Sequence, residues 1–208
     1  MKGLFITFEG PEGCGKTTQA KLLADLLASM GYNVTLTQDP GGSSIGDKVR
    51  KLLLDPLHGQ MAPLTELFLF LASRHQLVEE IIRKELEAGN IVISSRYTDA
   101  TLAYQGYGRK IDLELLKQLN DVATNNICPD LTILLDIDPQ RGIARARCRQ
   151  DLDRIEDEEI GFHETVRQGY LELCRLFPER IKKVDADDTI ENVQAEVKEL
   201  VIDVLDKI

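Results

Sequence analysis

The sequence predicts an α/β fold of three layers, in which helices cover both faces of a mostly parallel, doubly wound sheet. Three observations lead to this prediction. The 208-residue chain opens with an apolar segment, a glycine-rich loop and an apolar-periodic segment, in the order strand, loop, helix. Strand-like and helix-like segments alternate along the rest of the chain. Two strand-like segments are apolar almost throughout, as in parallel sheets covered on both faces.

The first elements follow from periodicity and from glycine. Residues 3–8 alternate β-branched and aromatic side chains and are predicted to form a strand. Apolar residues then recur at helical spacing from Ala20 to Met30, until Gly31 ends the helix. A second strand is expected at 32–38, and the "DPGGSS" string at 39–44 predicts a turn into the next helix.

The later elements complete the alternation. Residues 64–88 are predicted to form one long helix, kinked or shared between two surfaces, whose apolar first half suggests burial against another subunit or in the core. Residues 90–95 and 130–137 are predicted to be buried strands. The remaining helices are expected at 113–124, 139–149, 159–177 and 190–205, and a short last strand at 180–186.

Length, charge and cysteines restrict the class of protein. The length fits a single domain over residues 1–208, and 43% apolar residues suffice for a core. A net charge of −10 disfavours nucleic acid and anionic membranes as partners, and we expect neither a membrane span nor a leader. The cysteines, Cys14, Cys128, Cys148 and Cys174, lack metal-ligand spacing, which indicates free thiols in a reducing cytoplasm.

A phosphate-binding motif lies between the first strand and the first helix. Gly10, Gly15, Lys16 and Thr17 complete G-x-x-x-x-G-K-[ST], in the context that identifies a P-loop NTPase. Backbone N–H groups turn onto phosphate oxygens there, while the lysine reaches the β- and γ-phosphates and the threonine offers a hydroxyl to Mg²⁺. We predict that ATP, or another nucleoside triphosphate, contacts Gly10, Pro11, Glu12, Gly13, Cys14, Gly15, Lys16, Thr17 and Thr18.

Further strings of the sequence identify an acceptor. "RYTDATLAYQG" at 96–106, "DPGG" at 39–42 and "LFLFLASR" at 67–74 together resemble thymidylate kinase, with "PDLTILLDIDP" and "LDRIE" in the same order later. A guanine-binding "NKxD" string is absent. The resemblance implies transfer of the γ-phosphoryl of ATP to dTMP, giving dTDP and ADP in dTTP biosynthesis, with Mg²⁺ as cofactor and a homodimer as the assembly.

The resemblance also implies a pocket for dTMP. Phe70 and Arg74 lie four residues apart and share a helix face, so that the ring stacks on thymine and the guanidinium donates to a base carbonyl. Arg96, at the end of a strand, and Arg50 are expected to hold the acceptor phosphate. The full set expected at dTMP is Glu12, Asp39, Pro40, Arg50, Phe70, Arg74, Arg96, Thr101, Tyr104 and Gln105. Within it, the glutamate accepts from the 3′-hydroxyl, and the tyrosine ring occupies the space of a ribose 2′-hydroxyl.

Arginines are concentrated in a lid expected at about 142–158. Relatives carry either a basic residue inside the phosphate loop or arginines in this lid, and the loop here reads "PEGC", without a base. The resemblance therefore implies that lid arginines stabilise the charge of the transferred phosphoryl. We expect Arg149 and Arg154 to act with Lys16 and Arg96 in transfer, and leave Arg145 and Arg147 undecided.

The chain departs from the family pattern at two places. Ser95 stands where the family usually has the aspartate that positions Mg²⁺ or its waters, and Gln38-Asp39 stands where Arg-Glu is common. A serine can still bind a metal water, and Asp99, Asp136 or Glu12 are candidates to supply the missing charge. Two alternatives therefore stay open: a kinase for another deoxynucleoside monophosphate, and a nucleotide-binding relative with weakened catalysis.

Overall fold

The computed structural model describes residues 3–148 and 152–206, and within them five parallel strands form one sheet. In spatial order the strands are β2 (Val34–Gln38), β3 (Ile91–Ser95), β1 (Leu4–Glu9), β4 (Leu131–Asp136) and β5 (Ile181–Asp185). The chain first winds from β1 toward β2 and β3, and then continues on the other side of β1 through β4 and β5. The predicted doubly wound α/β fold is confirmed.

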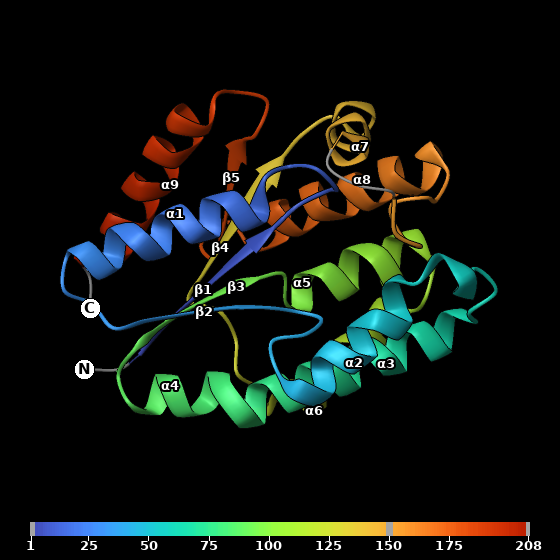
Figure 1. Cartoon of the computed structure of the whole chain (residues 1–208), viewed down its shortest axis with the longest axis horizontal. Coiled ribbons are helices and arrows are strands. Elements are labelled where there is room, and N and C mark those ends of the chain that lie inside the picture. Colours follow the sequence, from blue (N-terminus) through green and yellow to red (C-terminus); the bar gives the residue numbers. More distant parts are fainter. Residues whose placement is uncertain (1–2, 149–151, 207–208) are drawn as a thin grey trace.

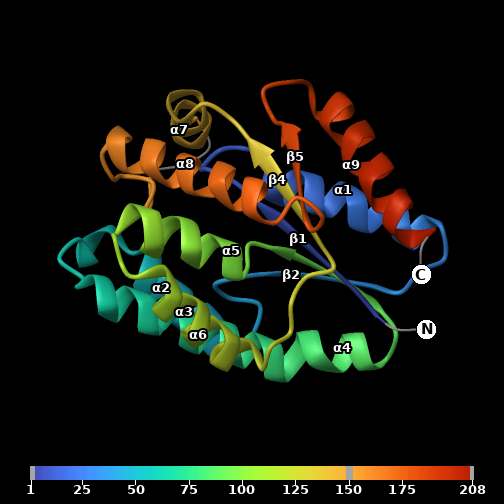
Figure 2. The same ribbon diagram turned by 180° about the vertical axis from the view of Figure 1, so that it is seen from behind.

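Helices cover the sheet on both faces, as Figures 1 and 2 show. On one face lie α1 (Lys16–Ser29) and α9 (Ile190–Leu205). On the other lie α3 (Pro63–Leu77), α4 (Arg83–Glu87), α6 (Leu113–Thr124) and α8 (Ile160–Leu176). Strand alternation assigns the side chains: Leu4, Ile6 and Phe8 enter the core under α1, whereas Phe5 enters the opposite core.

Several helix starts follow from local sequence. The α2 helix (Ser44–Leu54) is capped by Ser43, whose Oγ accepts from the N–H of Gly46 at 3.0 Å. The α7 helix (Pro139–Arg147) has Asp138 at its N-cap and proline at its first position, where the missing N–H costs nothing. Short elements complete the chain: a 3₁₀ turn at Pro56–His58, α5 (Thr98–Thr101) and a π-helical segment at Leu102–Gly108.

Two regions differ from the sequence prediction. The predicted helix at 64–88 is one continuous helical run, but its backbone changes to π-helical between α3 and α4, at Val78–Ile82. Residues 98–108, to which the sequence assigned no helix, are helical. Their glycines and lack of apolar periodicity hide this helix from pattern analysis, and its stability comes from packing against α8.

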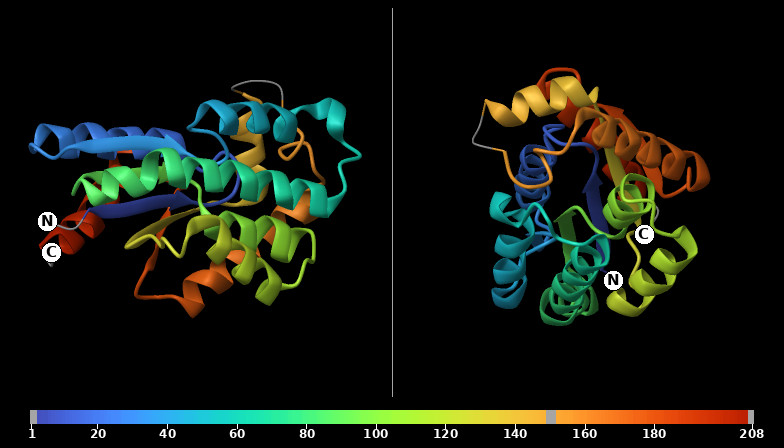
Figure 3. Two further views of the ribbon diagram at one scale, coloured as in Figure 1. Left: turned by 90° about the horizontal axis from the view of Figure 1, so that it is seen from below. Right: turned by 90° about the vertical axis from the view of Figure 1, so that its right-hand side faces the viewer.

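The parallel strands place all their carboxyl ends at one end of the molecule. Residues 3 and 206 lie at the opposite end (Figure 3). The phosphate loop follows β1 directly, and Asp39 and Arg96 follow β2 and β3. Within the described residues, no helix is both long enough and apolar enough to cross a bilayer.

Candidate active site

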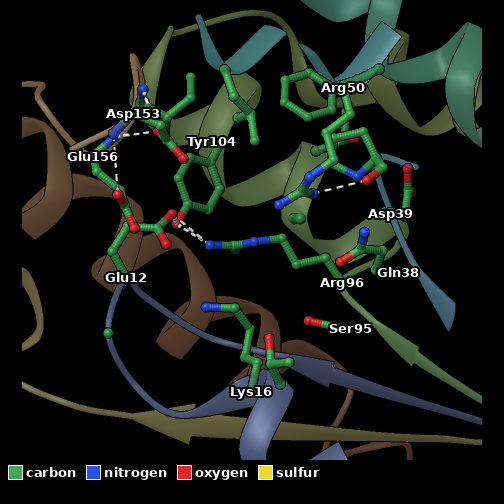
Figure 4. Close-up of a pocket in the computed structure, with 18 of the residues that line it drawn as sticks. Glu12, Lys16, Gln38, Asp39, Arg50, Ser95, Arg96, Tyr104, Asp153 and Glu156 are labelled. Carbon is green, nitrogen blue, oxygen red and sulfur yellow. Dashed lines mark hydrogen bonds and ion pairs between the residues drawn. The ribbon is translucent and has the colours of Figure 1, made fainter. Parts of the chain in front are cut away.

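An open cavity lies at the carboxyl ends of β1, β2 and β3 (Figure 4). The structure brings most of the predicted site residues to its wall, from the phosphate loop, α2, α3 and the helical segment 98–108. The predicted residues that line it are Glu12, Gly13, Gly15, Lys16, Thr17, Thr18, Asp39, Pro40, Arg50, Phe70, Arg74, Ser95, Arg96, Thr101, Tyr104 and Gln105. Residues from four separate stretches of sequence therefore share one cavity.

The phosphate loop has the backbone that its glycines permit. Gly13 adopts φ 68°, and a Cβ built on it would lie 1.9 Å from the carbonyl oxygen of Gly142, so only glycine fits against α7. The Nζ of Lys16 donates to the carbonyls of Gly10 at 3.0 Å and Pro11 at 2.7 Å. The lysine is thus held over the loop, at the first residue of α1, where the helix dipole favours an anion.

Arg96 lies at the centre of the cavity (Figure 4). Its backbone has φ 71°, a left-handed conformation that is uncommon for a residue with a side chain. Nη2 donates to Glu12 Oε1 at 2.5 Å and to the hydroxyl of Tyr104 at 3.0 Å. Nη1 donates to the Gly10 carbonyl and to the Tyr170 hydroxyl, both at 3.1 Å. The guanidinium therefore lies directly beside the phosphate loop.

Glu12 is the acidic partner of this arginine. Burial would raise the pKa of Glu12, but the charges of Arg96 and Lys16 outweigh it and lower the pKa to about 2. The Tyr104 hydroxyl also donates to Glu12, at 2.6 Å. Glu12 is thus a carboxylate at physiological pH, with a hydrogen-bond acceptor at the cavity wall.

Arg50 reaches the same cavity from α2. Its Nη1 donates to the Pro40 carbonyl at 2.9 Å, and in Figure 4 its guanidinium lies on the same side of the cavity as Arg96. Burial and the positive charge of Arg96 lower the pKa of Arg50. Two guanidinium groups that repel one another across open space form a place where an anion would be stabilised.

Arg74 is almost completely buried, with 1% of its surface exposed. Nε donates to Asp39 at 2.5 Å, and Nη1 donates to Thr101 and Asn120 at 2.8 and 2.6 Å. Nη2 donates to the Tyr97 carbonyl at 3.0 Å. These bonds among the described residues use four of the five N–H groups, so one remains for a ligand in the cavity.

Thr101 and Gln105 line the cavity, but their polar groups already have protein partners. Thr101 Oγ1 accepts from Arg74, and Gln105 Nε2 donates to Glu66 at 2.8 Å. Glu66 is buried and, although burial would raise its pKa, Arg109 and Gln105 lower it. The expected bonds from these two side chains to thymine remain predictions.

The lid arginines have different surroundings from those the sequence suggested. Arg154 does not line the cavity: Nη1 pairs with Glu66 at 2.7 Å, and Nε donates to the Leu53 carbonyl at 2.7 Å. In this conformation the arginine ties the segment after α7 to α2 and α3, because the Leu53 carbonyl is on α2 and the Glu66 carboxylate is on α3. Arg149 lies outside the described residues. Arg145 donates to the Ala186 carbonyl at 2.9 Å.

The hydroxyls of Thr17 and Ser95 are the groups here that suit Mg²⁺ or its waters, because they are oxygen ligands in the same cavity. Two of the suggested substitutes for the usual aspartate are wrong. Asp99 is buried and bound by Arg180 at 2.6 and 2.9 Å, and Asp136 is bound by Arg167 at 2.7 and 3.1 Å. Of the three candidates, only Glu12 lines the cavity.

Sequence reasoning missed other residues of the site. Asp153, Ile155 and Glu156 also line the cavity, and Figure 4 shows Asp153 and Glu156 on the same side as Glu12. All three belong to the "LDRIE" string, which could have identified them. The Asp153 carboxylate accepts from the N–H of Ile155 and that of Glu156, both at 2.9 Å, and so shapes this turn.

Comparisons with known proteins agree with this geometry. The family model for thymidylate kinase matches residues 8–197. A thymidylate kinase of Exiguobacterium sp. is 47% identical over 98% of this chain and 96% of its own length, and one of Syntrophotalea carbinolica is 51% identical over 91% and 90%. The crystal structure of thymidylate kinase from Ehrlichia chaffeensis superposes with a TM-score of 0.78 at 36% identity, covering 97% of this chain and 99% of that one. The chain therefore belongs to the thymidylate kinase family.

Proposed function

We propose that this protein transfers the γ-phosphoryl group of ATP to dTMP, giving ADP and dTDP. One observation carries the proposal: Arg50 and Arg96 lie together in a cavity that the phosphate loop with Lys16 also lines. The loop suits the donor phosphates, and the two arginines suit the acceptor phosphate. Donor and acceptor would then meet in line, which is most of what phosphoryl transfer requires.

Thymine would lie between Phe70 and the buried Arg74. Phe70 lines the cavity from α3, and its ring offers a stacking surface. The remaining N–H of Arg74 would donate to a base carbonyl, and Thr101 and Gln105 would contact the polar edge of the base. The Tyr104 ring, which lines the cavity, would lie beside the sugar. The Glu12 carboxylate would accept a hydrogen bond from the 3′-hydroxyl once it no longer accepts from Arg96.

Transfer builds negative charge that the protein must neutralise. Lys16 and Arg96 already border the phosphate loop, and we propose that Arg149 joins them from a lid over residues 142–158. Arg154 would join them only if it exchanged Glu66 for the phosphoryl group. The whole chain would act as one domain with this lid as its moving part.

The oxygen atoms that line the cavity fit Mg²⁺, although they supply only part of its ligands. When bound, it would supply positive charge that reduces the repulsion between phosphate oxygens. Thr17 would bind it directly and Ser95 through water, since both hydroxyls line the cavity. Among the described residues no three His, Cys, Asp or Glu side chains gather as a metal cage, so the phosphates must supply the other ligands.

We also propose that the protein is a cytoplasmic homodimer. Free cysteines, three of them at least partly accessible, support a reducing compartment. Exposed apolar side chains on α2 and α3 support the dimer: Ile45, Leu52, Leu64 and Phe68 have 49 to 56% of their surface exposed.

A coupled assay of ADP release tests the proposed activity. With ATP and Mg²⁺, we expect turnover to depend on dTMP far more than on dUMP, dCMP, dGMP or UMP. Preference for another monophosphate would favour the first alternative, and no turnover with any of them would favour a nucleotide-binding relative without catalysis. In a Lys16→Ala control we expect turnover to fall by at least about 100-fold while the protein stays folded, because the lysine holds charge on the phosphates.

A further inference from the structure

Glu9 is a buried carboxylate at the end of β1, just before the phosphate loop, and none of its surface is exposed. Strand alternation turns it away from α1, toward α5 and α8. Oε1 accepts from the N–H of Tyr97 at 2.7 Å and of Ala100 at 3.3 Å. Oε2 accepts from the hydroxyl of Tyr170 at 2.8 Å. Burial of a carboxylate is costly, and the three donors offset part of that cost. The presence of a carboxylate at this buried position therefore requires an explanation.

The contacts of Glu9 lead to Arg96 by two routes. The Tyr170 hydroxyl that donates to Glu9 also accepts from Arg96 Nη1 at 3.1 Å. The N–H of Tyr97, which follows Arg96 in the chain, donates to the same carboxylate. Because the backbone of Arg96 is left-handed and therefore strained, the peptide bond that follows it must be held in place by contacts with the surrounding structure. Glu9 thus restrains this arginine at its backbone and at its guanidinium.

We propose that Glu9, acting through Tyr170 and through the Tyr97 peptide, is the positioning residue that orients Arg96 for the acceptor phosphate. The proposal rests on the function proposed above, in which Arg96 binds that phosphate. Glu9 is a positioning residue because it reaches the ligand only through Arg96.

The hydrogen bonds of Arg96 divide into a fixed set and an exchangeable set. Nη1 donates to the Gly10 carbonyl and the Tyr170 hydroxyl, which both belong to the protein framework. Nη2 donates to Glu12 and Tyr104 at the cavity wall. An incoming phosphate can take Nη2 and Nε together as a bidentate pair while Nη1 keeps its partners. The Glu9–Tyr170 contact is therefore the part of the network that persists when the substrate binds.

A purely structural reading of Glu9 makes a different prediction. Its bonds to the Tyr97 and Ala100 N–H groups also cap the start of α5, so a role in folding alone is the alternative. Such a role would change stability without changing dTMP affinity. The distinction therefore depends on measuring binding and stability separately.

The titration of Glu9 gives a readout that separates the two roles. The groups facing it are Asp99 on α5, Arg96 after β3, Tyr170 on α8 and Arg180 before β5. Burial and the charge of Asp99 raise the pKa of Glu9 to about 7, against the effect of Arg96. Between pH 4.5 and about 7 the native state keeps a proton that the unfolded state releases, so stability falls as pH rises. Affinity for dTMP should instead rise through pH 7, because the ionised carboxylate is a stronger acceptor for the Tyr170 hydroxyl than the protonated carboxyl group is.

Calorimetric dTMP binding and steady-state kinetics test the proposal in Tyr170→Phe. This variant keeps the ring and loses the contact to Arg96, so we expect dTMP affinity and kcat/KM to fall about tenfold or more. The KM for ATP should change by less than about twofold, because Lys16 has no contact with Tyr170. Tyr32→Phe is the control: it also removes a tyrosine hydroxyl, on a side chain 38% exposed before β2 and outside the cavity lining, and should leave both constants within about twofold.

A second measurement follows affinity between pH 6.5 and 8, above the second phosphate pKa of about 6. Wild type should show a rise near pH 7 that Glu9→Gln lacks. Equal dTMP affinity in Tyr170→Phe and Tyr32→Phe would overturn the proposal, and so would an unchanged pH profile in folded Glu9→Gln. If Glu9→Gln does not fold, the Tyr170→Phe comparison decides. Wild type that neither binds nor phosphorylates dTMP would overturn the proposed function itself, which is a separate result.

Discussion

Ser95 and Gln38, the two departures from the family pattern, lie opposite one another on neighbouring strands. The β2–β3 register places Gln38 opposite Ser95, and both side chains line the cavity beside Thr17. Where the resemblance to the family implies an arginine and an aspartate, this chain has two neutral side chains, so one positive and one negative charge are missing together. The net charge at this edge of the site is therefore preserved.

This pairing predicts how the two positions respond to substitution. Ser95→Asp alone should lower the Mg²⁺ concentration for half-maximal ADP release about threefold to tenfold, because it adds a carboxylate near the metal waters. In the double variant with Gln38→Arg, ion pairing between the new side chains should cancel at least half of that gain. Mg²⁺ titrations of the wild type, the two single variants and the double variant form a double-mutant cycle. Strictly additive effects would mean that the two positions are independent.

Single residues of the site were predictable where a motif fixes them. The phosphate loop and the residues at 70, 74, 96, 101, 104 and 105 were found because their strings are specific and fall at strand ends or on one helix face. Glu9, Glu66 and Tyr170 were not, because each acts on a residue distant in sequence. Glu9 and Tyr170 are 161 positions apart, and only the fold brings them to hydrogen-bond distance.

At the level of elements, the segment after α7, which belongs to the proposed lid, is attached to α2 and α3. The Arg154 N–H donates to the Leu54 carbonyl at 3.0 Å, and its side chain joins Glu66. Arg109 pairs with Glu66 at 3.1 Å and with Glu158 at 2.6 Å, which adds a second tie between the segment and the core. One end of the proposed lid is thus anchored on α2 and α3.

Arg154→Met distinguishes an anchor from a phosphate ligand, because it keeps the aliphatic stem and removes the charge. As an anchor, Arg154 should mainly affect the acceptor wall: KM for dTMP rises about fivefold or more and limited proteolysis of residues 148–158 accelerates, while kcat changes little. As a phosphoryl ligand it would instead lower kcat by about 100-fold or more. Lys182→Met, on an exposed side chain that donates to the Pro178 carbonyl, is the control.

The order of the elements was predictable and the irregular ones were not. Parallel strands buried on both faces and helices with clear caps have strong local signals, and the bounds of α6 and α9 agree with the sequence prediction. The π-helical segments have no such signal, because their extra residue per turn interrupts apolar periodicity. They are held by tertiary packing, which no short window of sequence contains.

At the scale of the whole molecule, the exposed apolar side chains of α2 and α3 predict an assembly. Leu64 and Phe68 are one helical turn apart on α3 and are exposed at 51% and 56%. Phe68→Glu should convert a homodimer into monomers, measured by light scattering after size exclusion, because a buried unpaired charge opposes association. Ile190→Glu, on a side chain 53% exposed on α9 at the opposite face of the sheet, should leave the mass unchanged. A monomeric wild type would refute the dimer.

Four cations of the cavity already have oxygen partners within the protein: Lys16 on two carbonyls, Arg50 on the Pro40 carbonyl, Arg74 on Asp39 and Arg96 on Glu12. A ligand therefore exchanges contacts instead of adding them. Orthophosphate, which replaces one partner and offers no base or sugar in return, gains little from this exchange. The site should accordingly work in the presence of several millimolar orthophosphate, with KM for dTMP within about twofold of its value in buffer alone. Because its cations are paired with oxygens of the protein, the site selects against free orthophosphate even though its proposed substrates carry phosphate groups.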